Sequence, residues 1–166
     1  MCGIIGYIGT KKAKPILING LLRLEYRGYD SSGIATVEKD GIKVIKEKGR
    51  IANLDAMDGI NDLEGTIGIG HTRWATHGKP SAVNSHPHYD KDKLFAVVHN
   101  GIIENYHELR KLLEDNGYTF LSDTDTEVIP NLINFYYKKE NDFLKAVKIA
   151  CDDLKGSFAL EILCKY

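Results

Sequence analysis

The chain has 166 residues, of which 43% are hydrophobic and 27% are charged, so it is long enough to form one domain with a buried core. Its 22 basic and 23 acidic side chains nearly cancel, which argues against a nucleic-acid-binding protein. No apolar run approaches the roughly 20 residues that span a bilayer, and the N-terminus does not have the pattern of a signal peptide. We therefore expect a cytoplasmic protein that binds neither membranes nor nucleic acid. Three cysteines argue against a disulfide framework.

The first part of the chain predicts strands and one long helix. Alternating small and apolar residues at 3–8 predict a strand buried on both faces, and an apolar stripe with helical spacing follows at 13–24. Two β-rich runs, 33–38 and 42–47, are joined by Asp40-Gly41, which predicts a hairpin. A short helix at 51–57 and a buried strand at 66–70 are expected to follow.

The second part predicts mostly helices. A polar stretch at 72–93 leads to a buried strand at 94–98, and loops of this length are usually functional or disordered. Apolar periodicity then predicts three helices and a closing strand that begins at Ser157; the helices are expected at 104–116, 125–137 and 143–154. Pro130 would cost about 3 kcal/mol inside a helix, so the second of these should be kinked or start later. Because the last strand runs to Tyr166 without a turn, we expect a truncated chain.

Cys2 follows the initiator methionine and is a candidate nucleophile. Removal of Met1 would leave Cys2 with a free α-amine, whose pKa of about 7.7–8.0 suits a general base near neutral pH. Nucleophile and base would then belong to one residue. The alternative is a chance cysteine, but Gly3, Gly6 and Gly9 indicate that another backbone or a ligand approaches this strand closely.

Two polar clusters follow predicted strands. In the first, at 71–78, the Arg73 guanidinium suits a carboxylate, Trp74 could close over a ligand, and Thr76 and His77 add hydrogen-bonding groups. The alternative is a surface ion pair for Arg73 and a core position for Trp74. The second cluster is His99-Asn100-Gly101, which predicts either an oxyanion hole or an ordinary Asn-Gly turn.

A third cluster lies at 122–127, before the second predicted helix. Thr124 and Glu127 have the spacing of a capping box, which explains the cluster without any function. Alternatively, Asp125 binds the ammonium group of an amino acid whose carboxylate is bound by Arg73. The six histidines do not have the spacing of a metal site, so we expect neither a metal nor a cofactor.

Several strings together resemble one enzyme family, the class II glutamine amidotransferases, which are N-terminal nucleophile hydrolases. The first six residues, Met1 to Gly6, are similar to the start of these enzymes. Within the family, further strings look like the branch of isomerising glutamine–fructose-6-phosphate aminotransferases. They lie along almost the whole chain, at 24–33, 71–78, 85–88, 98–106 and 122–128.

The resemblance implies an α+β fold, a four-layer αββα sandwich of the N-terminal nucleophile hydrolase type. It implies a type 2 glutamine amidotransferase domain over 1–166 that is incomplete at its C-terminal end, with the sugar isomerase domains absent. L-glutamine would be the substrate, and fructose 6-phosphate would be bound only by the absent domains. The full-length enzyme is expected to be a homo-oligomer.

The resemblance also implies roles for single residues. Cys2, after removal of Met1, would attack the glutamine side-chain amide, and Arg27 would position this nucleophile. The oxyanion would be held by the Asn100 side chain and the Gly101 N–H. The remaining residues would bind the glutamine substrate: Arg73 its α-carboxylate, Asp125 its α-amine, and Trp74, Thr76, His77 and Gly101 further groups.

Three alternatives stay open. Another class II amidotransferase, such as the phosphoribosyl-pyrophosphate type, would differ in its C-terminal sequence. A non-catalytic glutamine-binding module would keep Arg73 and Asp125 but make no use of Cys2, and retention of Met1 would favour it. A Cys–His hydrolase would pair Cys2 with one of the six histidines as its base.

Overall fold

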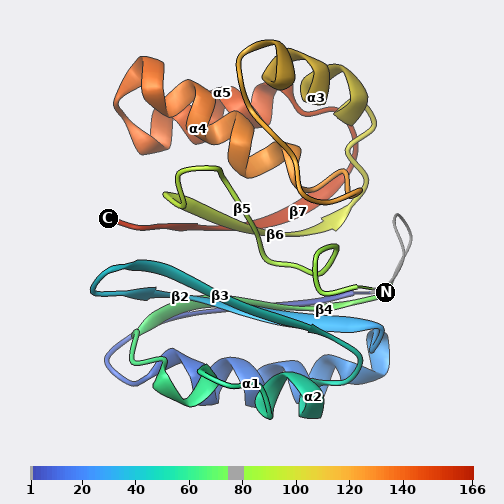
Figure 1. Cartoon of the computed structure of the whole chain (residues 1–166), viewed down its shortest axis with the longest axis vertical. Coiled ribbons are helices and arrows are strands. Elements are labelled where there is room, and N and C mark those ends of the chain that lie inside the picture. The colour runs from blue at the N-terminus through green and yellow to red at the C-terminus, as the bar shows by residue number, and fades with distance from the viewer. Residues whose placement is uncertain (1, 75–80) are drawn as a thin grey trace.

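Two antiparallel sheets lie face to face between two layers of helices (Figure 1). This computed structural model describes residues 2–74 and 81–166. The first sheet has the order β1-β4-β2-β3 and consists of β1 (Gly3–Ile8), β2 (Ser31–Glu38), β3 (Gly41–Lys48) and β4 (Ile67–Arg73). The second has the order β5-β6-β7 and consists of β5 (His88–Tyr89), β6 (Phe95–Gly101) and β7 (Phe158–Cys164). The expected α+β class and αββα layering are confirmed.

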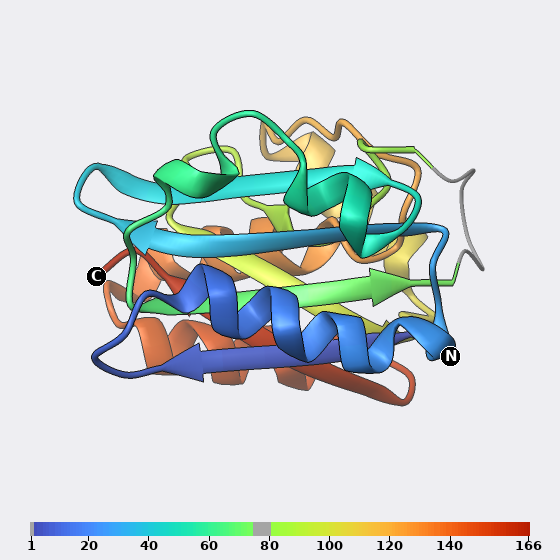
Figure 2. The ribbon, with the colours of Figure 1, turned by 90° about the horizontal axis from the view of Figure 1, so that it is seen from below.

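Each sheet carries helices on its outer face. On the first sheet these are α1 (Ala13–Leu24) and α2 (Ile51–Asp55), and α1 runs along the strands (Figure 2). On the second they are α3 (Tyr106–Asp115), α4 (Val128–Glu140) and α5 (Phe143–Asp153). Two single turns of 3₁₀ helix complete the described elements, at Glu25–Arg27 and Ile60–Asp62. None of the helices in the described ranges is long and apolar enough to cross a membrane.

Apolar side chains fill the three spaces between the four layers. Leu17, Leu21 and Leu54 are buried between the first helical layer and its sheet. Phe95 and Leu132 belong to the larger cluster on the other side, beneath α4 and α5. Between the sheets the cluster consists of Ala35, Ile42, Ile69, Ala96, Val98 and Leu163.

The two strands that carry the polar clusters are longer than the sequence predicts. β4 continues to Arg73 because it pairs with β1 on one side and β2 on the other. β6 continues to Gly101, which lies opposite Phe158 of β7, so the prediction of an Asn-Gly turn is wrong. Side-chain polarity suggested loops, but the backbone ladders decide where these strands end. The candidate residues therefore stand on sheet backbone, where their positions are fixed.

The strand predicted to be buried on both faces is instead an edge strand. Among the described strands β1 pairs only with β4, and Ile8 at its end is 78% exposed. Close approach at its glycines is confirmed, but by side chains. A Cβ on Gly3 would lie 2.7 Å from the Cβ of Leu24, and one on Gly6 would lie 2.9 Å from the Glu161 carboxylate.

Pro130 and Glu127 show how α4 begins. The helix starts at Val128, so Pro130 lies in the first turn, where a missing N–H leaves no helical bond unmade. The prediction of a later start is confirmed. The capping-box prediction is wrong, because the Glu127 carboxylate accepts hydrogen bonds from the backbone N–H groups of Leu121 and Ser122. Glu127 closes the preceding loop rather than the helix end.

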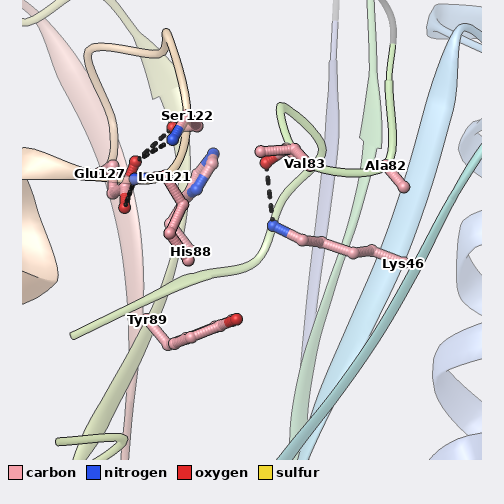
Figure 3. Close-up of a pocket in the computed structure, with 8 residues that line it drawn as sticks. All are labelled: Lys46, Ala82, Val83, His88, Tyr89, Leu121, Ser122 and Glu127. Atoms are coloured by element: carbon pink, nitrogen blue, oxygen red, sulfur yellow. Dashed lines mark hydrogen bonds between the residues drawn. The ribbon is translucent and has the colours of Figure 1, made fainter. Parts of the chain in front are cut away.

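Lys46 on β3 holds the segment that follows residues 75–80. Its Nζ donates to the carbonyl oxygens of Val83, Ser85 and Pro87 at 3.1, 2.8 and 3.3 Å. Burial lowers the pKa of this ammonium group to about 8, and the charge of Glu127 opposes that shift. Figure 3 shows Lys46 facing Glu127 across a cavity of about 340 Å³. The cavity separates the segment around Val83 from the loop that Glu127 closes.

Replacing Lys46 by methionine should destabilise the protein and loosen residues 81–87. The change keeps the length of the side chain but leaves three carbonyl groups without their donor, at a cost of about 1–3 kcal/mol. Urea unfolding measures the loss, and amide hydrogen exchange locates it. Lys43→Met, at an exposed position of the same strand, is the matched control. Equal stability of the two variants would contradict the anchoring role of Lys46.

Candidate active site

Cys2 lies where the first sheet ends beside Trp74. The pairing of β1 with β4 places Gly3 opposite Thr72, and the Gly3 N–H donates to Thr72 Oγ1 at 3.1 Å. Cys2 Sγ accepts a hydrogen bond from the Trp74 N–H at 3.2 Å, and the thiol donates to the Trp74 carbonyl oxygen at 3.6 Å. The register of two strands therefore fixes the candidate nucleophile.

Asn100 reaches Cys2 from the facing sheet. Its side-chain Nδ2 donates to the Cys2 carbonyl oxygen at 3.3 Å, and its Oδ1 accepts from His71 Nε2 at 2.8 Å. Gly101, next in β6, has φ of +130°, and a Cβ there would lie 2.3 Å from the Ser157 carbonyl oxygen. Only glycine fits this position. The amide NH₂ of Asn100 is thus directed at the main chain of Cys2.

Arg73 and Asp125 are opposite charges buried beside Cys2. Arg73 is 5% exposed and Asp125 is 6% exposed, and both line a small cavity of about 40 Å³ that also contacts Cys2 and Asn100. Burial lowers the pKa of Arg73, while the charges of Cys2 and Asp125 raise it. Asp125 Oδ2 also accepts from the Ile103 N–H at 2.8 Å, which ties the loop before α4 to the end of β6. A cation and an anion in one cavity suit a zwitterionic amino acid.

Arg27 and Trp74 also lie beside Cys2. Arg27 lines a second cavity, of about 610 Å³, together with Cys2, Asn100 and Gly101. Trp74 is 47% exposed, with its ring edge-on to Tyr29 at 5.7 Å, so it is not a core residue. Cys2 and Asn100 therefore stand at the boundary of two cavities, one with the charged pair and one with Arg27.

Two residues of the expected site lie outside the described ranges. They are Thr76 and His77, which belong to 75–80. Met1 also lies outside them, so its removal stays a prediction. The other expected residues come together at one end of the sandwich: Cys2, Arg27, Arg73, Trp74, Asn100, Gly101 and Asp125.

The sequence analysis did not predict a group of four buried histidines. His71, His86, His88 and His99 lie between the sheets, and the rings of His71 and His86 stack at 4.2 Å. His86 Nδ1 accepts from the His99 backbone N–H at 3.3 Å, so this ring is neutral. Side-chain hydroxyls of the loop before α4 complete the group: Thr126 contacts His86 and His99, and Thr124 contacts His88. The available signal was the position of two of them, since His71 continues the apolar row of Ile67 and Ile69 on β4 and His99 follows Phe95 and Val97 on β6.

Burial keeps these imidazoles neutral. It lowers the pKa of His71 to about 4, an effect that the hydrogen bond to Asn100 partly offsets. Burial also lowers the pKa values of His86 and His88 well below the usual range. It lowers the pKa of His99 too, and the charge of Asp125 opposes that shift. Within residues 2–74 and 81–166 no three His, Cys, Asp or Glu side chains are grouped to hold a metal ion. That the reaction needs no metal stays a prediction.

Acidification should destabilise the protein through this group. Unfolded histidines have a pKa of about 6.5, so between pH 6.5 and 4 the unfolded chain binds more protons and the free energy of unfolding falls as pH falls. Above pH 6.5 the effect is absent. For His71 alone, whose folded pKa is about 4, the loss at pH 5 is about 2 kcal/mol.

Urea unfolding at pH 7.5, 6 and 5 measures this loss. His88→Gln keeps a polar group near Thr124 and should flatten the pH profile, whereas His107→Gln, at an exposed position on α3, should leave it unchanged. A free energy of unfolding that stays constant from pH 7.5 to 5 would mean that the four histidines are charged or accessible in the folded protein.

Comparison with known proteins identifies the family. A sequence model described as a glutamine amidotransferase domain matches residues 71–165. A glutamine–fructose-6-phosphate aminotransferase (isomerizing) from Clostridium perfringens is 60% identical over 99% of this chain, and its counterpart from Caldanaerobacter subterraneus subsp. tengcongensis is 56% identical over 99%. The chain spans 27% of the length of each.

A solved structure shows the same fold. Glutamine phosphoribosylpyrophosphate amidotransferase from B. subtilis, in complex with ADP and GMP, superposes with a TM-score of 0.83. It is 27% identical, and the match covers 99% of this chain and 35% of that one. The chain therefore belongs to the class II glutamine amidotransferases, enzymes with the N-terminal nucleophile hydrolase fold.

Proposed function

We propose that this chain hydrolyses the side-chain amide of L-glutamine, with Cys2 as the nucleophile, and releases glutamate and ammonia. One observation carries the proposal. Cys2, an amide donor from Asn100 and the buried pair Arg73 and Asp125 meet at one end of the sandwich. Nucleophile, oxyanion donor and a zwitterion site are the groups that this reaction needs.

The first half of the reaction forms a thioester. After Met1 is removed, the α-amine of Cys2 takes the thiol proton, and Sγ attacks the carbonyl carbon of the glutamine side chain. The Nδ2 group of Asn100 and the Gly101 N–H stabilise the oxyanion. As the C–N bond breaks, the ammonium group returns the proton to the departing nitrogen, so ammonia leaves and a γ-glutamyl thioester remains.

Water completes the reaction. The free α-amine takes a proton from the attacking water, the tetrahedral intermediate again places its oxyanion at Asn100 and Gly101, and the thiolate leaves and regains the proton. The products are glutamate and the free enzyme. Because the amine acts as the base in both halves, a chain that retains Met1 should be inactive.

The charged pair recognises the amino-acid end of the substrate. The Arg73 guanidinium accommodates the α-carboxylate, and the Asp125 carboxylate accepts from the α-amine. Arg73 and Asp125 are both buried. An analogue that lacks the α-carboxylate or the α-amine leaves one of these buried charges without its partner, so it should bind much more weakly than glutamine. Trp74, Thr76, His77 and Gly101 add contacts, and Arg27 positions the nucleophile from the neighbouring cavity.

The relatives suggest what the ammonia is used for. We propose that residues 1–166 are the type 2 glutamine amidotransferase domain of a protein that makes glucosamine 6-phosphate from fructose 6-phosphate and glutamine. Identities of 60% and 56% to the fructose-6-phosphate aminotransferases, against 27% to the phosphoribosylpyrophosphate enzyme, support this branch. Sugar-phosphate binding, on sugar isomerase domains, and homo-oligomer formation would belong to parts of that protein beyond this chain.

We propose that the protein is cytoplasmic, and the state of its cysteines supports this. Cys2, Cys151 and Cys164 are free thiols, which suits a cytoplasmic protein.

The hydrogen bonds of Cys2 Sγ go to the backbone of Trp74 and none goes to a histidine within 2–74 and 81–166, which disfavours a Cys–His hydrolase. A binding module without catalysis would leave the Asn100 amide and Gly101 without a purpose.

Glutamate formation from glutamine tests the proposal. Cys2→Ala should abolish turnover while still binding glutamine, because the nucleophile is lost and Arg73 and Asp125 remain. Asn100→Ala should lower kcat by about 10²–10³ with little change in KM, because the donor acts on the oxyanion. Cys151→Ala, on α5, is the matched control and should behave as the parent protein. Turnover by the Cys2→Ala variant, or none by the parent protein with Met1 removed, would reject the proposal.

A further inference from the structure

We infer that His71 is a positioning residue: it determines which end of the Asn100 side-chain amide faces Cys2, an inference that rests on the proposed function. An asparagine amide has a donor end and an acceptor end of nearly the same shape. Stabilisation of an oxyanion requires the donor end. The opposite orientation would place the oxygen of the amide against the developing negative charge, so the orientation decides whether Asn100 helps or hinders the reaction.

Two contacts hold the Asn100 amide, one at each end. Oδ1 accepts from His71 Nε2 at 2.8 Å, and Nδ2 donates to the Cys2 carbonyl oxygen at 3.3 Å. The first contact is the shorter, and it comes from a side chain buried completely in the middle of β4. His71 stands opposite Ile4 in the β1–β4 ladder, so the strand pairing that places Cys2 also places this imidazole.

The contact orients the amide only if His71 carries its proton on Nε2. A ring protonated on Nδ1 alone would present a bare Nε2, which attracts the NH₂ end of Asn100 and turns its oxygen toward Cys2. The surroundings favour the required tautomer. Among the described residues His71 Nδ1 makes no hydrogen bond of ordinary distance and angle, and the face of the ring stacks on His86 at 4.2 Å. The His99 backbone interacts with the ring and raises its pKa, but less than Asn100 does.

Burial makes this preference strong. A buried N–H without an acceptor is rarer and costlier than a buried lone pair without a donor. Moving the proton to Nδ1 would place a buried N–H where no well-placed acceptor lies, and it would also break the hydrogen bond to Asn100. A charged ring is also unfavourable here, because burial lowers the pKa of His71 to about 4. At neutral pH His71 therefore offers one N–H, aimed at Asn100 Oδ1.

A matched pair of amide variants tests the positioning role. In His71→Gln the side-chain nitrogen is as many bonds from the backbone as Nε2, so it can still donate to Asn100. In His71→Asn the same amide is one carbon shorter and ends near the position of Nδ1. We expect kcat for glutamine hydrolysis to fall less than tenfold in the first and about 10- to 100-fold in the second, with KM nearly unchanged in both.

A double-mutant cycle separates positioning from a general structural effect. If His71 acts through Asn100, then His71→Asn should cause no further loss of kcat in the Asn100→Ala background. A structural role would give the same loss in both backgrounds. Circular dichroism and urea unfolding establish that each variant is folded. Should His71→Asn fail to fold, the comparison of His71→Gln with the parent protein still decides, since a folded His71→Gln variant with a 100-fold loss contradicts the inference.

The tautomer can be read directly by NMR. Long-range ¹H–¹⁵N spectra distinguish the two ring nitrogens, and the His71→Gln variant assigns the signals of His71. We expect a neutral ring protonated on Nε2 from pH 8 to 6, and a proton on Nδ1 would overturn the inference.

These outcomes are distinct from failure of the proposed function. If the parent protein does not hydrolyse glutamine, the proposed function fails, whatever the tautomer. If it does and the His71 variants match it, the glutaminase stands and the positioning role falls.

Discussion

The pairing of β4 with β1 and β2 is the constraint on which the rest of the site depends. One side of β4 holds β1 in register and so fixes Cys2 beside Trp74. The other side holds β2 and keeps Arg73 on the ladder to its last residue, opposite Ser31. The candidate nucleophile and the guanidinium are thus set by main-chain hydrogen bonds. Groups placed this way keep their geometry without relying on loop side chains.

The second sheet supplies what the first lacks. Its apolar residues Ala96 and Val98 belong to one cluster with Ala35 of the first sheet, and its polar residues gather toward the end that carries Cys2. There the interlayer space holds hydrogen-bonded neutral histidines rather than an apolar core, and Asn100 crosses to Cys2. Burial of so many polar groups costs stability unless each is paired. The same burial strengthens the electrostatic interactions among the buried polar groups.

Periodicity predicted the elements whose burial is simple. The helix at 13–24 and the hairpin around Asp40-Gly41 are present because one face of each is apolar and a turn residue marks the end. The strand ends at Arg73 and Gly101 were not predictable, because polar side chains on a strand resemble a loop when the partner strands are unknown. The hydrogen bonds from the Leu121 and Ser122 N–H groups to the Glu127 carboxylate could not be predicted from the sequence either. The contact of His71 with Asn100 joins positions 29 residues apart, and no rule of sequence spacing predicts it.

In the proposed reaction Cys2 attacks the side-chain amide of glutamine, and the amide oxygen then lies against Asn100 and Gly101. A crystal structure of the protein after reaction with a diazoketone analogue of glutamine is the decisive experiment, because the trapped ketone oxygen stands in for the substrate carbonyl oxygen. We expect a single bond to Cys2 Sγ, that oxygen at about 3 Å from Asn100 Nδ2 and from the Gly101 nitrogen, and the analogue's carboxylate on Arg73. An adduct on another residue, or an oxygen turned away from Asn100, would contradict it.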